Sequence, residues 1–194
     1  MRWLKPAVFT ASLLPLVWLG WQAGFGSLGV NPVETLNRFL GDWALRFLLL
    51  ALAVTPVRQW THWAPLAKVR RMLGLYAFFY VCLHLGSYLG IDLFFDWAAL
   101  WKDVVKRTYI TLGMSAFVLL VPLALTSTNA MIRRLGGARW RLLHRLVFPA
   151  GILAVAHYWM MVKADIREPL VYAVILAVLL GWRLKGFVRR PLRA

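Results

Sequence analysis

The sequence predicts an all-α integral membrane protein, a six-helix transmembrane bundle with both termini in the cytoplasm. Three observations carry this prediction. Apolar residues make up 61% of the 194 residues and charged residues only 15%, well below the roughly one quarter usual in a soluble domain. Six apolar runs each come near the ~20 residues that cross a bilayer core. The segments between them alternate between purely basic and electrically balanced, as loops on opposite sides of a membrane do.

The predicted spans follow one another as a single domain over residues 1–194. They are residues 7–23, 43–57, 72–90, 109–127, 142–162 and 169–184. No linker is long enough to separate two domains, and we find no internal repeat. A cleaved signal peptide is the competing interpretation of residues 1–25, but no clean A-x-A site follows, so we expect a retained helix.

The net charge of +16 falls on one side of this predicted bundle. The N-terminus, the loop after the second span, the segment after the fourth span and the C-terminal tail hold only basic charges. The opposite loops balance basic against acidic residues. By the positive-inside rule the basic side is cytoplasmic. Orientation and anionic membrane lipid explain the charge, and a nucleic-acid partner is not expected.

Two segments between the spans have helical patterns of their own. Residues 91–108 repeat apolar side chains at helical spacing, which predicts an amphipathic helix on the outer membrane surface, either an interfacial anchor or a docking surface. Its apolar face would consist of Leu93, Trp97, Leu100, Trp101 and Val104. On the inner side, Asn129 is the expected cap of a short helix that Gly136 and Gly137 would end.

The four histidines are the candidates for chemistry, because no Asp, Glu or Lys lies in the middle of a predicted span. His62 lies in an inner loop beside tryptophans, where we expect no chemistry. His84, His144 and His157 lie inside spans, where ionisable groups are costly and by default indicate function. His84 and His157 fall at similar depth on two parallel spans, so their imidazoles could bind one iron axially. A hydrogen bond between helices is the alternative.

His144 and His157 belong to the same predicted span. Their thirteen-residue spacing leaves the two side chains ~140° apart on an ideal helix. Pro149 lies between them and predicts a kink or a local change of pitch. The single cysteine, Cys82, excludes a disulfide framework and Cys-x-x-Cys chemistry, and we expect it to be a small buried apolar residue.

The sequence combines six predicted spans, histidines on the third and fifth of them, and two short motifs. The motifs are RWRLLHRLVF at residues 139–148 and HYW at residues 157–159. In these features the chain resembles the ferric-reductase-like transmembrane family. More closely, it is similar to the haem-binding membrane subunits of bacterial periplasmic methionine-sulfoxide reductase systems. The resemblance covers essentially the whole chain. It implies an electron-transfer subunit of the bacterial inner membrane rather than a complete enzyme.

The resemblance also implies cofactors and partners. Such subunits take electrons from the quinone pool or from a cytoplasmic flavin reductase. They pass them through haem b, one haem or two, and with FMN, to a soluble periplasmic molybdopterin reductase that repairs oxidised methionines. On this resemblance His84 and His157 would ligate the outer haem. His144 would be a ligand or a neighbour of an inner site.

The chain departs from the two-haem pattern of the wider family. That pattern has a second histidine thirteen or fourteen residues before His84, where this chain has Arg71 and Arg70. Arginine does not readily deprotonate to ligate iron. Its planar fork suits a haem propionate or a flavin phosphate, and plain positive-inside topology is the alternative. A single haem with a flavin and a second haem at His144 both stay open.

Two other functions stay open at this point. In a haem-free scaffold or transporter, the histidines would bridge helices by hydrogen bonds. A self-sufficient quinol or metal reductase would need no protein acceptor. No G-x-G-x-x-G follows a strand, so we expect the electron donor to be a separate protein, a bound flavin or quinol.

Overall fold

The computed structural model describes residues 3–26, 28–162 and 164–188, with side chains as far as residue 184. Every regular element in this part is a helix, which confirms the all-α prediction. The long helices are α1 (Leu4–Gly24), α2 (Pro32–Thr61), α3 (Arg70–Ser87), α5 (Thr108–Leu125), α8 (Val147–Met161) and α9 (Arg167–Val188). The short ones are η1 (Ala64–Lys68), η2 (Tyr88–Asp92), α4 (Trp97–Lys106), α6 (Asn129–Leu135), α7 (Gly137–Leu143) and η3 (His144–Leu146).

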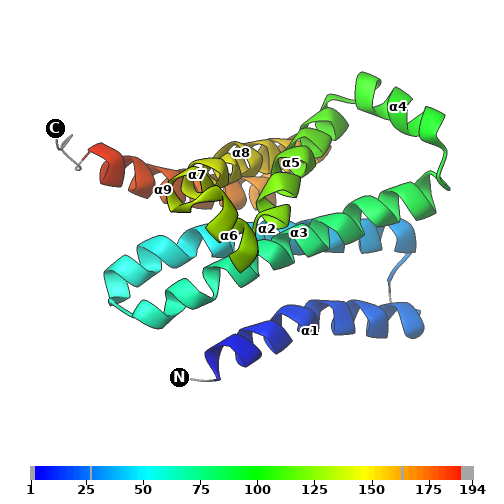
Figure 1. Ribbon diagram of the computed structural model, residues 1–194. Coiled ribbons are helices and arrows are strands. Elements are labelled where there is room, and N and C mark those ends of the chain that lie inside the picture. Colours follow the sequence, from blue (N-terminus) through cyan, green and yellow to red (C-terminus); the bar gives the residue numbers. More distant parts are fainter. Residues whose placement is uncertain (1–2, 27, 163, 189–194) are drawn as a thin grey trace.

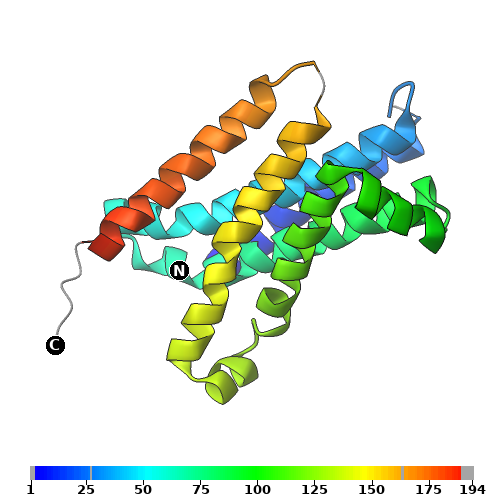
Figure 2. The same ribbon diagram turned by 90° about the horizontal axis from the view of Figure 1, so that it is seen from above.

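Two helix pairs make up the centre of the bundle. The closest packing joins α2 to α3 and α5 to α8, while α1 and α9 lie on the outside (Figures 1 and 2). The start of α1, the end of α9, η1, α6 and α7 lie toward one end, which we call the basic end (Figure 2). The connection from α1 to α2, helix α4 and the connection from α8 to α9 lie toward the other, the mixed end.

The two ends of the bundle differ in charge. All seven acidic residues belong to the first half of α2, the surroundings of α4 and the start of α9, which are at or toward the mixed end. The charged side chains described at the basic end are Lys and Arg alone. The structure therefore separates the charges as the sequence predicts, and the cytoplasmic side of the basic end remains a prediction from the positive-inside rule.

Four helices in the described part of the chain are long and apolar enough to cross a membrane. They are α1, α2, α3 continued by η2 (Arg70–Asp92) and α5. The predicted span at 142–162 is interrupted, because α7 gives way to the tight turn η3 and only the 15 residues of α8 follow. Helix α9 begins with the charged pair Arg167 and Glu168. The count of six spans therefore remains a prediction.

Helix α2 is longer than the predicted 43–57 because its first turns are capped and polar. The Asn31 side chain accepts a hydrogen bond from the backbone N–H of Glu34, and Pro32 takes the first helical position. Glu34 pairs with Arg38 one turn later at 2.6 Å. A prediction from apolar runs misses these turns, because their side chains line a cavity and do not face lipid.

The expected helices at 91–108 and after residue 128 are present as α4 and α6, but the start of each helix and the burial of Cys82 differ from the prediction. The outer amphipathic helix begins at Trp97, after Asp96 caps it, and Leu93 lies outside it beyond the π-helical turn η2. The cap of α6 is Thr128, whose hydroxyl accepts from the N–H of Met131. Cys82 lies exposed on the outer side of α3, because the inner face of that helix is occupied by larger side chains such as the buried Tyr80.

Two tyrosines of α3 hold α1 against the bundle. The fully buried Tyr80 donates its hydroxyl to the carbonyl of Ser12 at 2.8 Å. Tyr76 donates to the carbonyl of Phe9, one turn nearer the start of α1, at 3.1 Å. A hydroxyl at membrane depth needs such a partner, since no water is present to replace it.

The orientation of the bundle can be measured with single cysteines in a Cys82→Ser background. We expect Lys102→Cys, on exposed α4, to react with a membrane-impermeant maleimide in intact cells. Arg134→Cys, on exposed α6 at the basic end, should react only after the membrane is opened. Labelling in the reverse order would show that the basic end faces outward.

Candidate functional site

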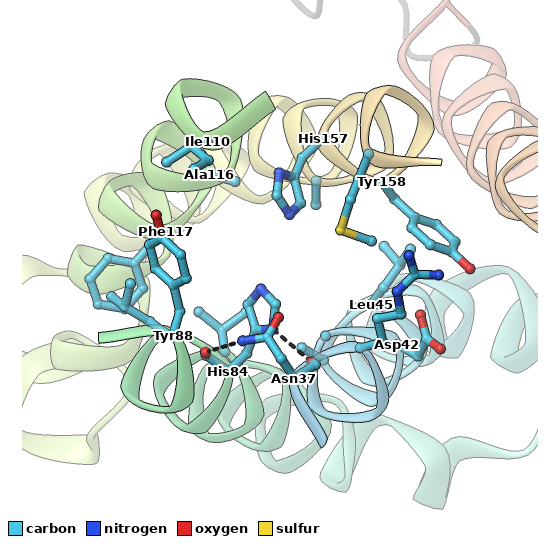
Figure 3. Close-up of a pocket in the computed structure, with 18 of the residues that line it drawn as sticks. Asn37, Asp42, Leu45, His84, Tyr88, Ile110, Ala116, Phe117, His157 and Tyr158 are labelled. Atoms are coloured by element: carbon cyan, nitrogen blue, oxygen red, sulfur yellow. Dashed lines mark hydrogen bonds between the residues drawn. The ribbon is translucent and has the colours of Figure 1, made fainter. Parts of the chain in front are cut away.

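A cavity of about 440 Å³ lies among α2, α3, α5 and α8, toward the mixed end (Figure 3). His84 comes from the last turn of α3 and His157 from the second half of α8. The two rings point toward each other across the cavity, with their centroids 6.3 Å apart. The structure thus brings together the two histidines that the sequence places at similar depth.

His84 is held by α2 through a backbone carbonyl. Its Nδ1 lies 2.9 Å from the carbonyl oxygen of Asn37, and the Asn37 amide donates in return to the carbonyl of His84 at 3.1 Å. Gly41 follows Asn37 by one helical turn. A Cβ at Gly41 would lie only 3.1 Å from two atoms of the His84 ring. Because a helical side chain leans toward the preceding turn, only glycine leaves that carbonyl open to the imidazole.

His157 is held by α5 in the same way. Its Nδ1 lies 2.6 Å from the carbonyl oxygen of Tyr109, and Gly113 follows Tyr109 by one turn. A Cβ at Gly113 would lie 3.0 Å from that Nδ1. The α2–α3 and α5–α8 pairs therefore build the same seat, a carbonyl exposed by a glycine four residues later.

The hydrogen bond to the backbone carbonyl determines which ring nitrogen of each histidine stays free. A carbonyl oxygen can only accept, so Nδ1 of His84 and Nδ1 of His157 each carry the proton and donate it. Each Nε2 then keeps its lone pair for a partner in the cavity. A backbone carbonyl behind Nδ1 is the usual outer-shell partner of a metal-ligating histidine, because it fixes the tautomer and makes Nε2 more basic.

The walls of the cavity repeat the same pattern on α2 and α5. Each helix presents Gly-x-x-Ala-x-x-x-Leu, at residues 41–48 and at residues 113–120, and all these Gly, Ala and Leu positions line the cavity. The small residues leave room for a flat ligand, and the leucines keep the inner wall apolar. The sequence analysis missed this repeat, although its identical spacing was visible in the sequence.

Polar side chains gather where the cavity opens toward the mixed end. Asn31, Glu34, Arg38 and Asp92 line it there, while Asp42 lines it beside Gly41, level with the His84 ring. Figure 3 shows Asp42 beside the cavity, away from the apolar wall formed by Ile110, Ala116 and Phe117. The cavity thus combines an apolar interior with a charged mouth, the usual composition of a cofactor site.

The other predicted site residues lie away from this cavity. His144 stacks on Trp140 with ring centroids 3.8 Å apart, and its Nε2 lies 3.4 Å from the Ser127 hydroxyl. Arg71 donates to the Asn129 side chain at 2.6 Å. His144 and Arg71 both belong to the basic end, as the sequence predicts. Neither lines the cavity of His84 and His157. His144 and His157 both lie against the α5 side, His144 beside Ser127 and His157 beside Tyr109, so they face one neighbouring segment at different depths.

Arg70 has a neighbour that the sequence analysis did not single out. Its Nη1 donates to the Thr55 hydroxyl at 3.3 Å, and Nη2 of Arg183 donates to the same oxygen at 3.3 Å. In the sequence, Arg183 is distinguishable only as one of the basic residues near the C-terminal end. No sequence signal pairs it with Arg70, because α9 and α3 are joined here only through α2.

Comparison with known proteins gives one family match and many curated relatives. The family described as Ferric reductase like transmembrane component matches residues 40–155. Three relatives share the name Protein-methionine-sulfoxide reductase heme-binding subunit MsrQ. The protein of Rhodospirillum rubrum is 61% identical over 184 residues, covering 95% of this chain and 88% of its own. That of Caulobacter vibrioides is 52% identical, covering 91% and 84%. That of Xanthomonas oryzae pv. oryzae is 51% identical, covering 92% and 84%.

The two glycine seats give a stability prediction. We expect Gly41→Ala and Gly113→Ala each to lower the free energy of unfolding by about 1–3 kcal/mol, because the new Cβ overpacks the imidazole and stretches its hydrogen bond. Gly74→Ala, on α3 with nothing within 4 Å of its would-be Cβ, is the matched control and should not destabilise. Unfolding in mixed micelles, followed by circular dichroism, measures all three. Equal stability of the three variants would show that the imidazole hydrogen bonds do not need glycine at positions 41 and 113.

Proposed function

Because the chain belongs to the ferric-reductase-like transmembrane family and, within it, to the MsrQ haem-binding subunits, we propose that it is a b-type cytochrome that relays electrons across the bacterial inner membrane. The donor is the quinone pool or a cytoplasmic flavin reductase. The acceptor is the periplasmic molybdopterin catalytic subunit of a methionine-sulfoxide reductase, which repairs oxidised proteins. The chain is the electron-transfer subunit of this system.

The observation that carries the proposal is the pair of opposed imidazoles. His84 and His157 face each other with both Nε2 lone pairs free and with ring centroids 6.3 Å apart. A bond of about 2 Å from a metal to each imidazole nitrogen, together with the distance from that nitrogen to its ring centre, requires a centroid separation of about 6 Å. The residues present therefore fit one haem iron between them.

Haem, when bound, supplies reversible one-electron transfer. The protein's own residues do the rest. Asn37 and Tyr109 hold the two imidazoles in one tautomer and one orientation through their carbonyls. Leu48 and Leu120 exclude water from the inner wall. Arg38 at the mouth offers a guanidinium to a carboxylate, beside the Glu34 that it pairs with here.

The position of the cavity supports the direction of transfer. Its lining comes from the first half of α2, the end of α3, the first two thirds of α5 and the end of α8, and so lies toward the mixed end. In the orientation that we propose, with the basic end in the cytoplasm, His84 and His157 lie near the periplasmic surface. The final step to a periplasmic acceptor is then short.

The haem-free alternative explains less of the site. Each imidazole does bridge two helices, His84 from α3 to α2 and His157 from α8 to α5, as a purely structural role requires. That role uses Nδ1 alone. It gives no reason for two free Nε2 atoms to face each other across an apolar cavity walled by glycine and alanine.

Haem content tests the proposal directly. We expect His84→Ala and His157→Ala each to abolish low-spin haem binding, because each removes one axial nitrogen. His62→Ala, at the exposed end of α2, is the control and should keep full haem. Haem per chain is measured as the pyridine haemochrome, with the air-oxidised and dithionite-reduced spectra beside it. Full haem in both site variants would overturn the assignment.

The proposed electron transfer is tested by measuring reoxidation of the reduced protein by its proposed acceptor. The dithionite-reduced protein, freed of excess reductant, should be reoxidised under anaerobic conditions when the purified periplasmic catalytic subunit and methionine sulfoxide are both added. Omitting either should leave the reduced spectrum unchanged. Reoxidation by ferric chelates but not by the catalytic subunit would instead favour a self-sufficient metal reductase.

A further inference from the structure

Two arginines meet at one hydroxyl near the basic end. Arg70, at the start of α3, and Arg183, on α9, both donate to the Oγ1 of Thr55 on α2. Since both guanidinium groups lie within hydrogen-bond distance of one oxygen, they lie side by side.

Arg183 is fixed at this position by the backbone of α2. Pro56 has no N–H, so the carbonyl of Leu52 loses its helical partner, and Nη2 of Arg183 donates to that oxygen at 3.2 Å. The Phe148 ring lies against the guanidinium, 5.1 Å from centroid to Cζ. The Nε of Arg183 is left buried without a partner, one of two such side-chain atoms in the described part of the chain.

No carboxylate described in the structure balances this pair. The salt bridges in the described ranges involve Glu34, Asp103 and Asp165, which all belong to elements at the mixed end. Repulsion between two like charges placed together raises the free energy, and an anion bound between them adds an attractive interaction with each. The site therefore has positive charge, an unused donor and a hydroxyl, but no anion of its own.

We propose that Arg70, Arg183 and Thr55 bind the phosphate group of a ligand that enters from the basic end. The planar forks of two arginines match phosphate oxygens in geometry and charge, and a threonine hydroxyl adds a donor. Two sources share this chemistry, the phosphate monoester of a flavin mononucleotide and the headgroup of an anionic lipid. Arg71 does not take part, because it is committed to Asn129.

The place of this site along α2 gives it a role, and this role rests on the proposed function. Thr55 lies fourteen residues beyond Gly41, about 20 Å along the helix. A flavin held here by its phosphate lies between a donor at the basic end and the cavity of His84 and His157. It would shorten the path that an electron crosses.

The probe is FMN, with riboflavin as the matched compound that lacks the phosphate. Both are titrated into the full-length, haem-loaded chain in nanodiscs of zwitterionic lipid, with flavin fluorescence as the readout. We expect FMN to bind at least about tenfold more tightly than riboflavin, and Arg70→Gln and Arg183→Gln each to remove about that factor. Arg71→Gln should bind FMN as the wild type does.

A second arm separates the two sources. The titration is repeated in nanodiscs containing phosphatidylglycerol, and native mass spectrometry counts retained anionic lipid. Competition with FMN, with lipid retention that falls in Arg70→Gln and Arg183→Gln but not in Arg71→Gln, assigns the site to a lipid headgroup. FMN binding that the lipid leaves unchanged assigns it to the flavin.

One result overturns the proposal, namely equal affinity for FMN and riboflavin together with lipid retention that no arginine variant changes. An unchanged haem spectrum in each variant shows that the fold is intact. Arg183→Lys, which keeps the charge near the Leu52 carbonyl, replaces Arg183→Gln if the latter does not fold, and the loss of the planar fork should still weaken FMN binding. The FMN titration depends on the arginine pair and not on haem between His84 and His157. The proposal for the arginine site and the proposal for the haem site can therefore fail independently.

Discussion

The arrangement depends on one interaction, the hydrogen bond from an imidazole Nδ1–H to a backbone carbonyl that a glycine leaves uncovered. In a helix each carbonyl already accepts one bond, and its second lone pair faces the side chain of the next turn. Gly41 and Gly113 remove that side chain. The imidazoles of His84 and His157 can then reach α2 and α5 closely enough for their opposite nitrogens to meet across a cavity.

The same interaction explains why the central helices are paired as they are. Each glycine in a helix interior costs about 1 kcal/mol relative to alanine, so two of them facing histidines need a compensating gain. At membrane depth that gain is large, because an imidazole N–H left without a partner in hydrocarbon costs more than the glycine does. The α2–α3 and α5–α8 pairs meet this need with the same spacing of Gly, Ala and Leu on α2 and on α5.

Most of the fold and half of the candidate site could be predicted from local patterns in the sequence. Helix content, charge separation and the depth of His84 and His157 follow from composition and rise per residue, which are properties of single helices. Pro149 predicted a kink or a local change of pitch, and the tight turn η3 ends three residues before it. The glycine seats and the pairing of Arg183 with Arg70 did not emerge, because both depend on contacts between helices far apart in the chain. The start of α2 was missed because its polar turns line a cavity, where the hydropathy of a lipid-facing span does not apply.

The two ends of the bundle favour different chemistry, and this division argues for a relay more than for a pump. The acidic residues that line the cavity are Glu34, Asp42 and Asp92, and the deepest of them along α2, Asp42, directly follows the Gly41 that faces His84. The cavity lining therefore includes no chain of carboxylates leading inward from the imidazoles. At the basic end the charges are cationic and suit anions, not protons in transit. A proton path through the membrane needs titratable groups spaced along its whole depth. An electron path needs only redox centres close enough together, and the opposed imidazoles of His84 and His157 are the position that we propose for one of them.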